Sequence, residues 1–325
     1  MKKAIGGLDV MVDYYHGGSL AAWVKEHPSI ILWVRERSKR PIFGWKSYDD
    51  WTANLGKDGR YIIDDNHRII DKRTRKGTEL DIESGISEIR DSLAQPGNYL
   101  RLTGLSGVGK TRLAQALFDE KIGGKFLNQS QVIYTDISYD PTPSPQNIAE
   151  QLVAGKYQAV LVIDNCSPQL HRALVEKLKV QSHSVSLLTI EYDVADDQPD
   201  ETGVFHLEPS SDQVIKKLVL RRVPEIGELA AWKVAEFSGG NARVALALAK
   251  SLTPGESIGH LQDNALFDRL FNQRNSENNG LKNSAEVLSL VYSYDVENTE
   301  AENSELGTLS LLSSEILPVC WTADG

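Results

Sequence analysis

The chain contains the run Gly104-Leu105-Ser106-Gly107-Val108-Gly109-Lys110-Thr111, which matches the pattern GxxxxGK[ST]. Its glycines allow the backbone to curl so that successive N–H groups point inward, where they can bind phosphate groups. The pattern has this meaning only between a strand and a helix. Tyr99–Thr103 before it is typical of a short strand, and the residues after it space their apolar side chains as a helix does. The run is called the glycine-rich loop below.

This loop predicts a nucleotide site for ATP or ADP with Mg²⁺. Lys110 would reach the β- and γ-phosphates, and the hydroxyl of Thr111 would ligate Mg²⁺. The residues expected to contact the nucleotide here are Gly104, Ser106, Gly107, Val108, Gly109, Lys110, Thr111 and Arg112.

A second element supports the loop. The apolar run Ala159–Asp164 is typical of a strand that is covered on both faces, and it ends in a carboxylate 54 residues after Lys110. We expect this strand to be a parallel neighbour of the strand before the loop, which would place Asp164 beside the Mg²⁺. Lys110, Asp164 and Asn165 are the predicted catalytic residues, and Thr111 and Asp164 the predicted metal ligands.

Asn165 occupies the position where many hydrolases of this kind carry Glu or Asp. Asn can orient a water molecule but cannot accept its proton, which favours slow or conditional hydrolysis. The alternative is that another residue, for instance Glu191, supplies the acid.

Two further residues are candidates for detecting the γ-phosphate. Thr189 lies near the end of the predicted strand Ser184–Ile190, although a core strand can end in a polar residue without any such role. Arg243 lies in the run Gly239–Leu246, which opens a later helix, and the alternative there is an exposed helix arginine.

Outward from the loop, helix and strand signals alternate with short turns, so we expect an α/β protein with a parallel sheet flanked by helices. Ser144-Pro145 and Ser167-Pro168 are helix N-cap signatures within this alternation. After Pro209 only helical patterns follow, up to a last one at Ile258–Phe271. The expected organisation is an N-terminal module at 1–78, the sheet domain at 79–209, a helical lid at 210–270 and a final segment at 271–325.

The N-terminal 78 residues differ in charge from the rest. They hold 15 Lys plus Arg against 10 Asp plus Glu, whereas the remainder holds 20 against 35, and they contain Trp23, Trp33, Trp45 and Trp51. Basic residues among aromatics are compatible with a nucleic-acid surface, but a solvated linker beside a small aromatic core is the plainer interpretation. The role of this part is not predicted.

The amino-acid composition excludes several classes of protein. A formal net charge of −10 argues against general nucleic-acid binding by the whole chain. Two cysteines exclude a disulfide scaffold and a four-cysteine zinc site and fit a reducing cytoplasm. No apolar run is long enough to span a membrane, and the first ten residues make a poor signal peptide.

The order of these motifs resembles the STAND NTPases, the signal-transducing relatives of AAA+ ATPases that include the NACHT and NB-ARC groups. The resemblance rests on the glycine-rich loop, on LVIDN at 161–165, on LLTIEYD at 187–193 and on GGNARVALALA at 239–249. The segment 266–294 is similar to the start of the winged-helix domain that follows the lid in this family. The resemblance implies a switch in which ATP replaces ADP, opens a closed monomer, permits oligomerisation and releases an effector. In bacteria it implies antiphage defence or transcriptional control.

The sequence departs from the STAND pattern at several points, and these differences leave alternative functions open. Ala242 stands where many NB-ARC members use Pro against the adenine, so the base preference rests on the resemblance alone. No sensor repeats follow the winged-helix-like segment, so we expect a truncated gene product, the alternative being a minimal module that works with other proteins. GGNAR is also similar to origin-recognition AAA+ proteins, which keeps open an ATPase that loads on or remodels DNA. A catalytically inactive scaffold is the third possibility.

Overall fold

The structure is a computed structural model that describes residues 16–36, 42–53, 61–62, 66–73, 76–179, 184–191, 202–252 and 266. The chain divides into two compact units, and the division falls between Pro209 and Ser210. This position coincides with the expected start of the helical lid.

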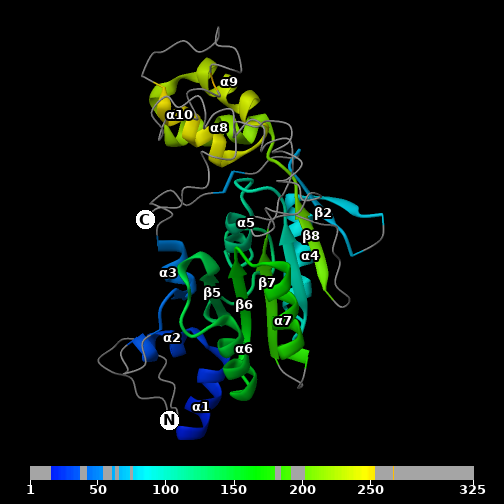
Figure 1. Cartoon of the computed structure of the whole chain (residues 1–325), viewed down its shortest axis with the longest axis vertical. Coiled ribbons are helices and arrows are strands. Elements are labelled where there is room, and N and C mark those ends of the chain that lie inside the picture. The colour runs from blue at the N-terminus through cyan, green and yellow to red at the C-terminus, as the bar shows by residue number, and fades with distance from the viewer. Residues whose placement is uncertain are drawn as a thin grey trace, which may run out of the picture. The chain divides into compact units, whose positions relative to one another are not determined.

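In the described part of the chain, eight strands form one sheet in the order β1-β5-β6-β7-β4-β8-β2-β3 (Figure 1). The five central strands are parallel, and β1, β2 and β3 join the two edges in antiparallel pairs. The strands are β1 Trp45–Lys46, β2 Arg68–Asp71, β3 Thr78–Asp81, β4 Tyr99–Thr103, β5 Val132–Asp136, β6 Gln158–Asp164, β7 Ser184–Ile190 and β8 Gly203–Leu207. The expected α/β class with a mostly parallel sheet is confirmed.

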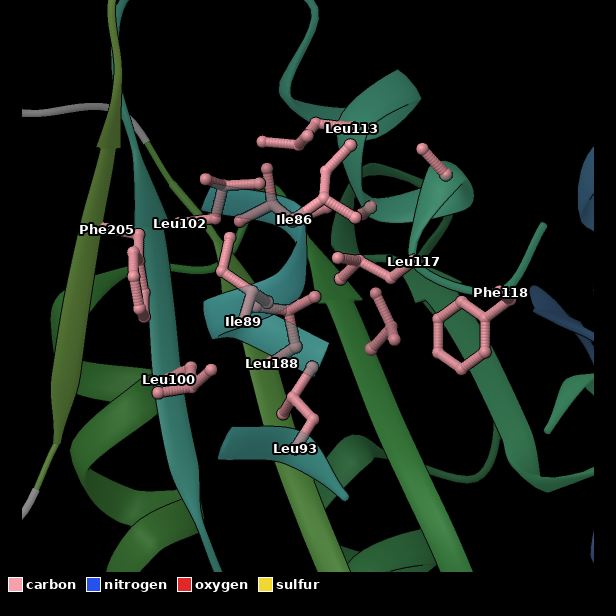
Figure 2. Packing of buried hydrophobic residues seen from close by; sticks show 14 of the residues in the cluster. Ile86, Ile89, Leu93, Leu100, Leu102, Leu113, Leu117, Phe118, Leu188 and Phe205 are labelled. Carbon is pink, nitrogen blue, oxygen red and sulfur yellow. The ribbon is translucent and has the colours of Figure 1, made fainter. Parts of the chain in front are cut away.

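Helices cover both faces of this sheet (Figure 1). One face packs against α4 (Ile82–Leu93) and α5 (Lys110–Ala116), and the other packs against α6 (Pro145–Ala154) and α7 (Pro168–Lys179). Alternate side chains of β4, β5, β6 and β7 enter the two cores, whereas β8 contributes only to the core under α4 and α5. Figure 2 shows Leu100 and Leu102 of β4 beside the apolar side chains that α4 turns to the sheet.

The helices that follow the parallel strands change face. The helix after β4 lies on one face of the sheet, and the helices after β5 and β6 lie on the other. In an open parallel sheet such a change separates neighbouring connections and opens a crevice outside the carboxyl ends of the strands, where ligands bind. The glycine-rich loop leaves β4 at this edge.

Both predicted N-caps are present. The hydroxyl oxygen of Ser144 accepts the backbone N–H of Asn147 at 3.4 Å, and that of Ser167 accepts the N–H of Leu170 at 3.2 Å. The proline after each serine costs no hydrogen bond because the first N–H groups of a helix have no partner inside it.

The expected boundary near residue 78 does not separate compact units. β1 pairs with β5, β2 pairs with β8, and the indole N–H of Trp45 donates to the Pro143 carbonyl at 2.8 Å. Three short helices precede or flank β1: α1 Gly17–Glu26, α2 Ser29–Glu36 and α3 Tyr48–Thr52. Strands of two and four residues are too short to show a period. Trp45 and Trp51 find their partners at Pro143 and Tyr134 of the sheet domain, whereas Trp23 stacks on His27.

The second unit is helical in its described residues. It contains α8 (Asp212–Arg222), α9 (Glu228–Ser238) and α10 (Ala242–Ser251), which share a core that includes Ala231 and Leu248. Apart from Leu266, the predicted helix at 258–271 and the winged-helix-like segment lie outside the described residues. Among the helices that are described, none has the length and apolar character needed to cross a membrane.

Candidate functional site

The glycine-rich loop connects β4 to α5 and depends on its glycines. Gly104, Gly107 and Gly109 have φ values of +136°, +87° and +110°, a region that other residues rarely adopt. A Cβ on Gly104 would also come within 2.5 Å of the Leu207 carbonyl oxygen. Val108 is 2% exposed and anchors the loop in the core below α5. The loop is therefore held in a tight curl between two rigid elements.

Lys110 brings a positive charge into this curl. Its side chain is 8% exposed, and its Nζ donates to the carbonyl oxygens of Gly104 and Leu105 at 2.6 and 2.7 Å. The amine thus lies inside the arc of the loop. Because α5 begins at Lys110, the positive end of a helix dipole adds to its charge. This combination is suited to an anion such as a phosphate group.

Thr111 of α5 and Asp164 of β6 meet although β4, the strand before the glycine-rich loop, is not a neighbour of β6. The hydroxyl of Thr111 donates to Oδ2 of Asp164 at 2.7 Å. The predicted position of β6, which ends in Asp164, directly beside β4 is wrong, because β7 lies between them. The contact forms because α5, which begins just before Thr111, belongs to the core on the face that also contains Val160 and Val162 of β6.

Asp164 is a buried carboxylate that accepts several hydrogen bonds. Burial raises its pKa above the ordinary range, while the bonds from Thr111 and from the Asn165 amide, the latter 2.9 Å to Oδ1, act in the opposite direction. A hydroxyl and a carboxylate are the hard oxygen ligands that Mg²⁺ takes in proteins, usually with waters and substrate phosphates completing the shell. Thr111 and Asp164 therefore fit a magnesium ion.

Tyr134 is a contact of Asp164 that was not predicted from the sequence. Its hydroxyl donates to Oδ2 of Asp164 at 3.2 Å, and its ring stacks on Trp51 of α3 with centroids 4.2 Å apart. Burial raises the pKa of Tyr134, and the charge of Asp164 raises it further, so the hydroxyl stays protonated and donates. The N-terminal part of the chain thereby supports the candidate metal site. No local signal in the sequence marks this pair.

Asn165 has an unusual backbone and a specific partner. Its φ is +53°, in the left-handed region that Asn tolerates better than most residues. Its side-chain Nδ2 donates to Oδ1 of Asp136 at 2.8 Å. Asp136 ends β5, and its Cα pairs with that of Asp164 on β6. Three polar residues thus lie together at the carboxyl ends of these two strands.

Thr189 and Glu191 belong to a buried polar network. Arg101 of β4 and Glu191 form a two-pronged ion pair with N–O distances of 2.9 and 2.7 Å. The Thr189 hydroxyl donates to Glu191 at 2.9 Å and lies 2.8 Å from Nδ1 of His171. Glu191 is 2% exposed and Thr189 is fully buried. The role of Thr189 as a γ-phosphate detector stays a prediction.

Arg112 and Arg243 lie in different units. The Arg112 guanidinium covers the ring of Tyr61 at 3.8 Å and donates to Gln115 at 3.1 Å. Arg243 is exposed in the first turn of α10, which Asn241 caps by accepting the Arg243 N–H at 3.0 Å. The two readings of Arg243, a γ-phosphate contact or an exposed helix arginine, both stay open.

Comparisons with known proteins gave structural likenesses only. No protein-family model matches the chain, and no curated protein matches it. A STAND protein with a tetratricopeptide repeat sensor from Pyrococcus horikoshii is similar with a TM-score of 0.39 and 14% identity over 73% of this chain. PCH-2 from C. elegans is similar with a TM-score of 0.34 and 13% identity over 58%. The chain spans 37% of the first protein and 65% of the second.

Proposed function

We propose that the chain binds ATP and ADP at the glycine-rich loop. The observation that carries this proposal is the position of the Lys110 amine, which lies inside a curl of positive-φ glycines at the start of α5. The loop also leaves the central strand β4 at the edge where the covering helices change face. Backbone N–H groups, a buried cation and a helix N-terminus together select phosphate groups.

Mg²⁺ would be held by Thr111 and Asp164, and when bound it would neutralise charge on the nucleotide phosphates. The Thr111 hydroxyl and the Asp164 carboxylate are already in contact, so the protein donors are preorganised. Tyr134 holds the carboxylate from the neighbouring strand. The remaining positions around the metal would come from phosphate oxygens and water.

Tyr134→Phe should therefore weaken Mg²⁺ binding to the nucleotide complex by about 10-fold, since partners of a metal ligand typically contribute 10- to 100-fold to metal affinity. The measurement is a Mg²⁺ titration of the protein with a fluorescent ADP analogue. Binding of the analogue in EDTA should stay unchanged. Tyr139→Phe, which alters an exposed tyrosine, is the matched control. A Tyr134→Phe titration that overlays the wild type would contradict the role of this hydroxyl.

The biological role we propose is a signalling switch that is closed with ADP and open or oligomeric with ATP, and that slow hydrolysis resets. The motif order of the STAND NTPases supports this role, and antiphage defence or regulation is the setting which that resemblance implies. Asn165 in place of an acid supports slow turnover, because its amide orients water but does not take a proton.

The experiment is to measure nucleotide content and molecular mass of the purified chain. We expect co-purified ADP, a monomer in ADP and a larger species in a non-hydrolysable ATP analogue. Protein without ADP that turns over ATP rapidly with DNA would indicate a motor that acts on DNA instead. If Lys110→Ala changed neither nucleotide content nor mass, the chain would be an inactive scaffold.

A further inference from the structure

Asp136 is a carboxylate at the candidate site to which the proposed function gives no role. It ends β5, and its Cα is paired with that of Asp164 at the end of β6. Neighbouring strands lie about 4.8 Å apart, so the two carboxylates share the same edge of the sheet. The charge of Asp136 also contributes, after burial, to raising the pKa of Asp164.

The hydrogen bonds of Asp136 orient its carboxylate. Its Oδ1 accepts the backbone N–H and the hydroxyl of Ser138 at 2.9 and 2.7 Å, and it also accepts Nδ2 of Asn165 at 2.8 Å. In the described part of the chain all three donors reach Oδ1, so Oδ2 is left to accept from another molecule. Because Nδ2 of Asn165 is held by Asp136, the amide oxygen of Asn165 is also directed away from this bond.

Three carboxylates lie at the carboxyl ends of the strands β5, β6 and β7, and two of them have other partners. Asp164 contacts Thr111 in the candidate metal site. Glu191 is buried, and both of its carboxylate oxygens are held by the Arg101 guanidinium. Asp136 is half-buried, and its hydrogen-bond partners among the described residues, Ser138 and Asn165, carry no charge. It is the carboxylate best placed to accept a proton.

We propose that Asp136 is the general base for ATP hydrolysis and that Asn165 positions the attacking water beside it. The proposal rests on the proposed ATP site. The water would give its proton to Asp136 while its oxygen bonds to the γ-phosphorus. The bond from that phosphorus to the bridging oxygen breaks, and its electron pair leaves with ADP. Phosphate is released, and Asp136 returns the proton to solvent.

The same arrangement explains Asn165. With φ at +53°, a glutamate at this position would have a strained backbone, whereas Asn adopts it readily. An acid placed here would also face the carboxylate of Asp136, and the two like charges would repel each other. Asn165 instead donates to Asp136 and leaves the proton-accepting role to the neighbouring strand.

The test is Asp136→Asn, which keeps the shape of the side chain and an oxygen that can accept from Ser138. We expect single-turnover ATP hydrolysis to fall by about 100-fold, the lower end of what a general base contributes, with ATP affinity in Mg²⁺ within about threefold of wild type. Asp140→Asn is the matched control, because it removes the same charge from an exposed residue a few positions away whose φ of +49° suits Asn. Its rate should equal that of wild type.

Other outcomes separate this inference from the proposed function. An unchanged rate in Asp136→Asn would overturn the inference, and so would rate and affinity falling together, which would mean a structural role. A wild-type chain that binds ATP without hydrolysing it would overturn the inference and leave nucleotide binding intact. A wild-type chain that binds no nucleotide would remove the proposed function itself.

Discussion

Lys110→Ala should weaken ATP binding by about 100-fold. The amine now donates to the carbonyls of Gly104 and Leu105 and is already inside the loop, so it can turn to phosphate oxygens without a large movement. A hydrogen bond from a charged group contributes about 1.5–3 kcal/mol, so two such bonds at the lower end of that range correspond to about a 100-fold change in affinity. Equilibrium titration with a fluorescent ATP analogue measures the effect.

The matched control for this experiment is Lys121→Ala, which removes the same charge from an exposed lysine after α5. We expect the Lys121 variant to bind ATP as the wild type does. The melting temperature without nucleotide should be recorded for both variants, because Lys110 also satisfies two loop carbonyls. Equal ATP affinity in the Lys110 variant and the wild type would rule out this loop as the nucleotide site.

Glu191→Ala should lower the free energy of unfolding of the sheet unit by about 3–5 kcal/mol, because it leaves a buried guanidinium without its counterion. The Arg101 side chain is 3% exposed and the Glu191 side chain 1% exposed, and the two join β4 to the end of β7. The carboxylate also accepts the hydroxyl of Thr189. Urea denaturation followed by circular dichroism provides the measurement.

Two comparisons make this stability test specific. Glu150→Ala breaks the exposed pair of Glu150 with Lys177 and should cause no measurable change. The double variant Arg101→Met with Glu191→Leu removes both charges and should recover much of the stability that Glu191→Ala loses. A loss below about 1 kcal/mol in Glu191→Ala would contradict the importance of the buried pair.

The central sheet was predictable because its signals are local. The strands β4 and β7 have the predicted bounds, since short runs rich in apolar and β-branched residues between turns indicate strands without reference to their partners. The caps at Ser144 and Ser167 were predictable for the same reason. The order of the strands was not predictable from such local signals. β7 lies between β4 and β6, so the prediction that these two strands are neighbours was wrong.

The parts of the candidate site that the sequence did not show depend on distant partners. Tyr134 reaches Asp164 across 30 positions, and Trp51 reaches Tyr134 from a helix in the part expected to be a separate module. Asp136 could have been noticed, because it ends the run Gln131–Asp136, which is typical of a strand, and parallel strands end at one edge of a sheet. The hydrogen bond between Asp136 and Asn165 could not have been predicted, because it depends on the left-handed backbone conformation of Asn165.

Hydrogen–deuterium exchange of the full chain, with and without ATP and Mg²⁺, is the most direct measurement of where nucleotide binds. We expect slower exchange at 104–111, where the loop N–H groups would bind phosphate, and at 164–165, next to the metal ligand. Lys110→Ala should show neither change at the same ATP concentration. Unaltered exchange at 104–111 in the wild type, or protection confined to another part of the chain, would contradict a nucleotide site in this loop.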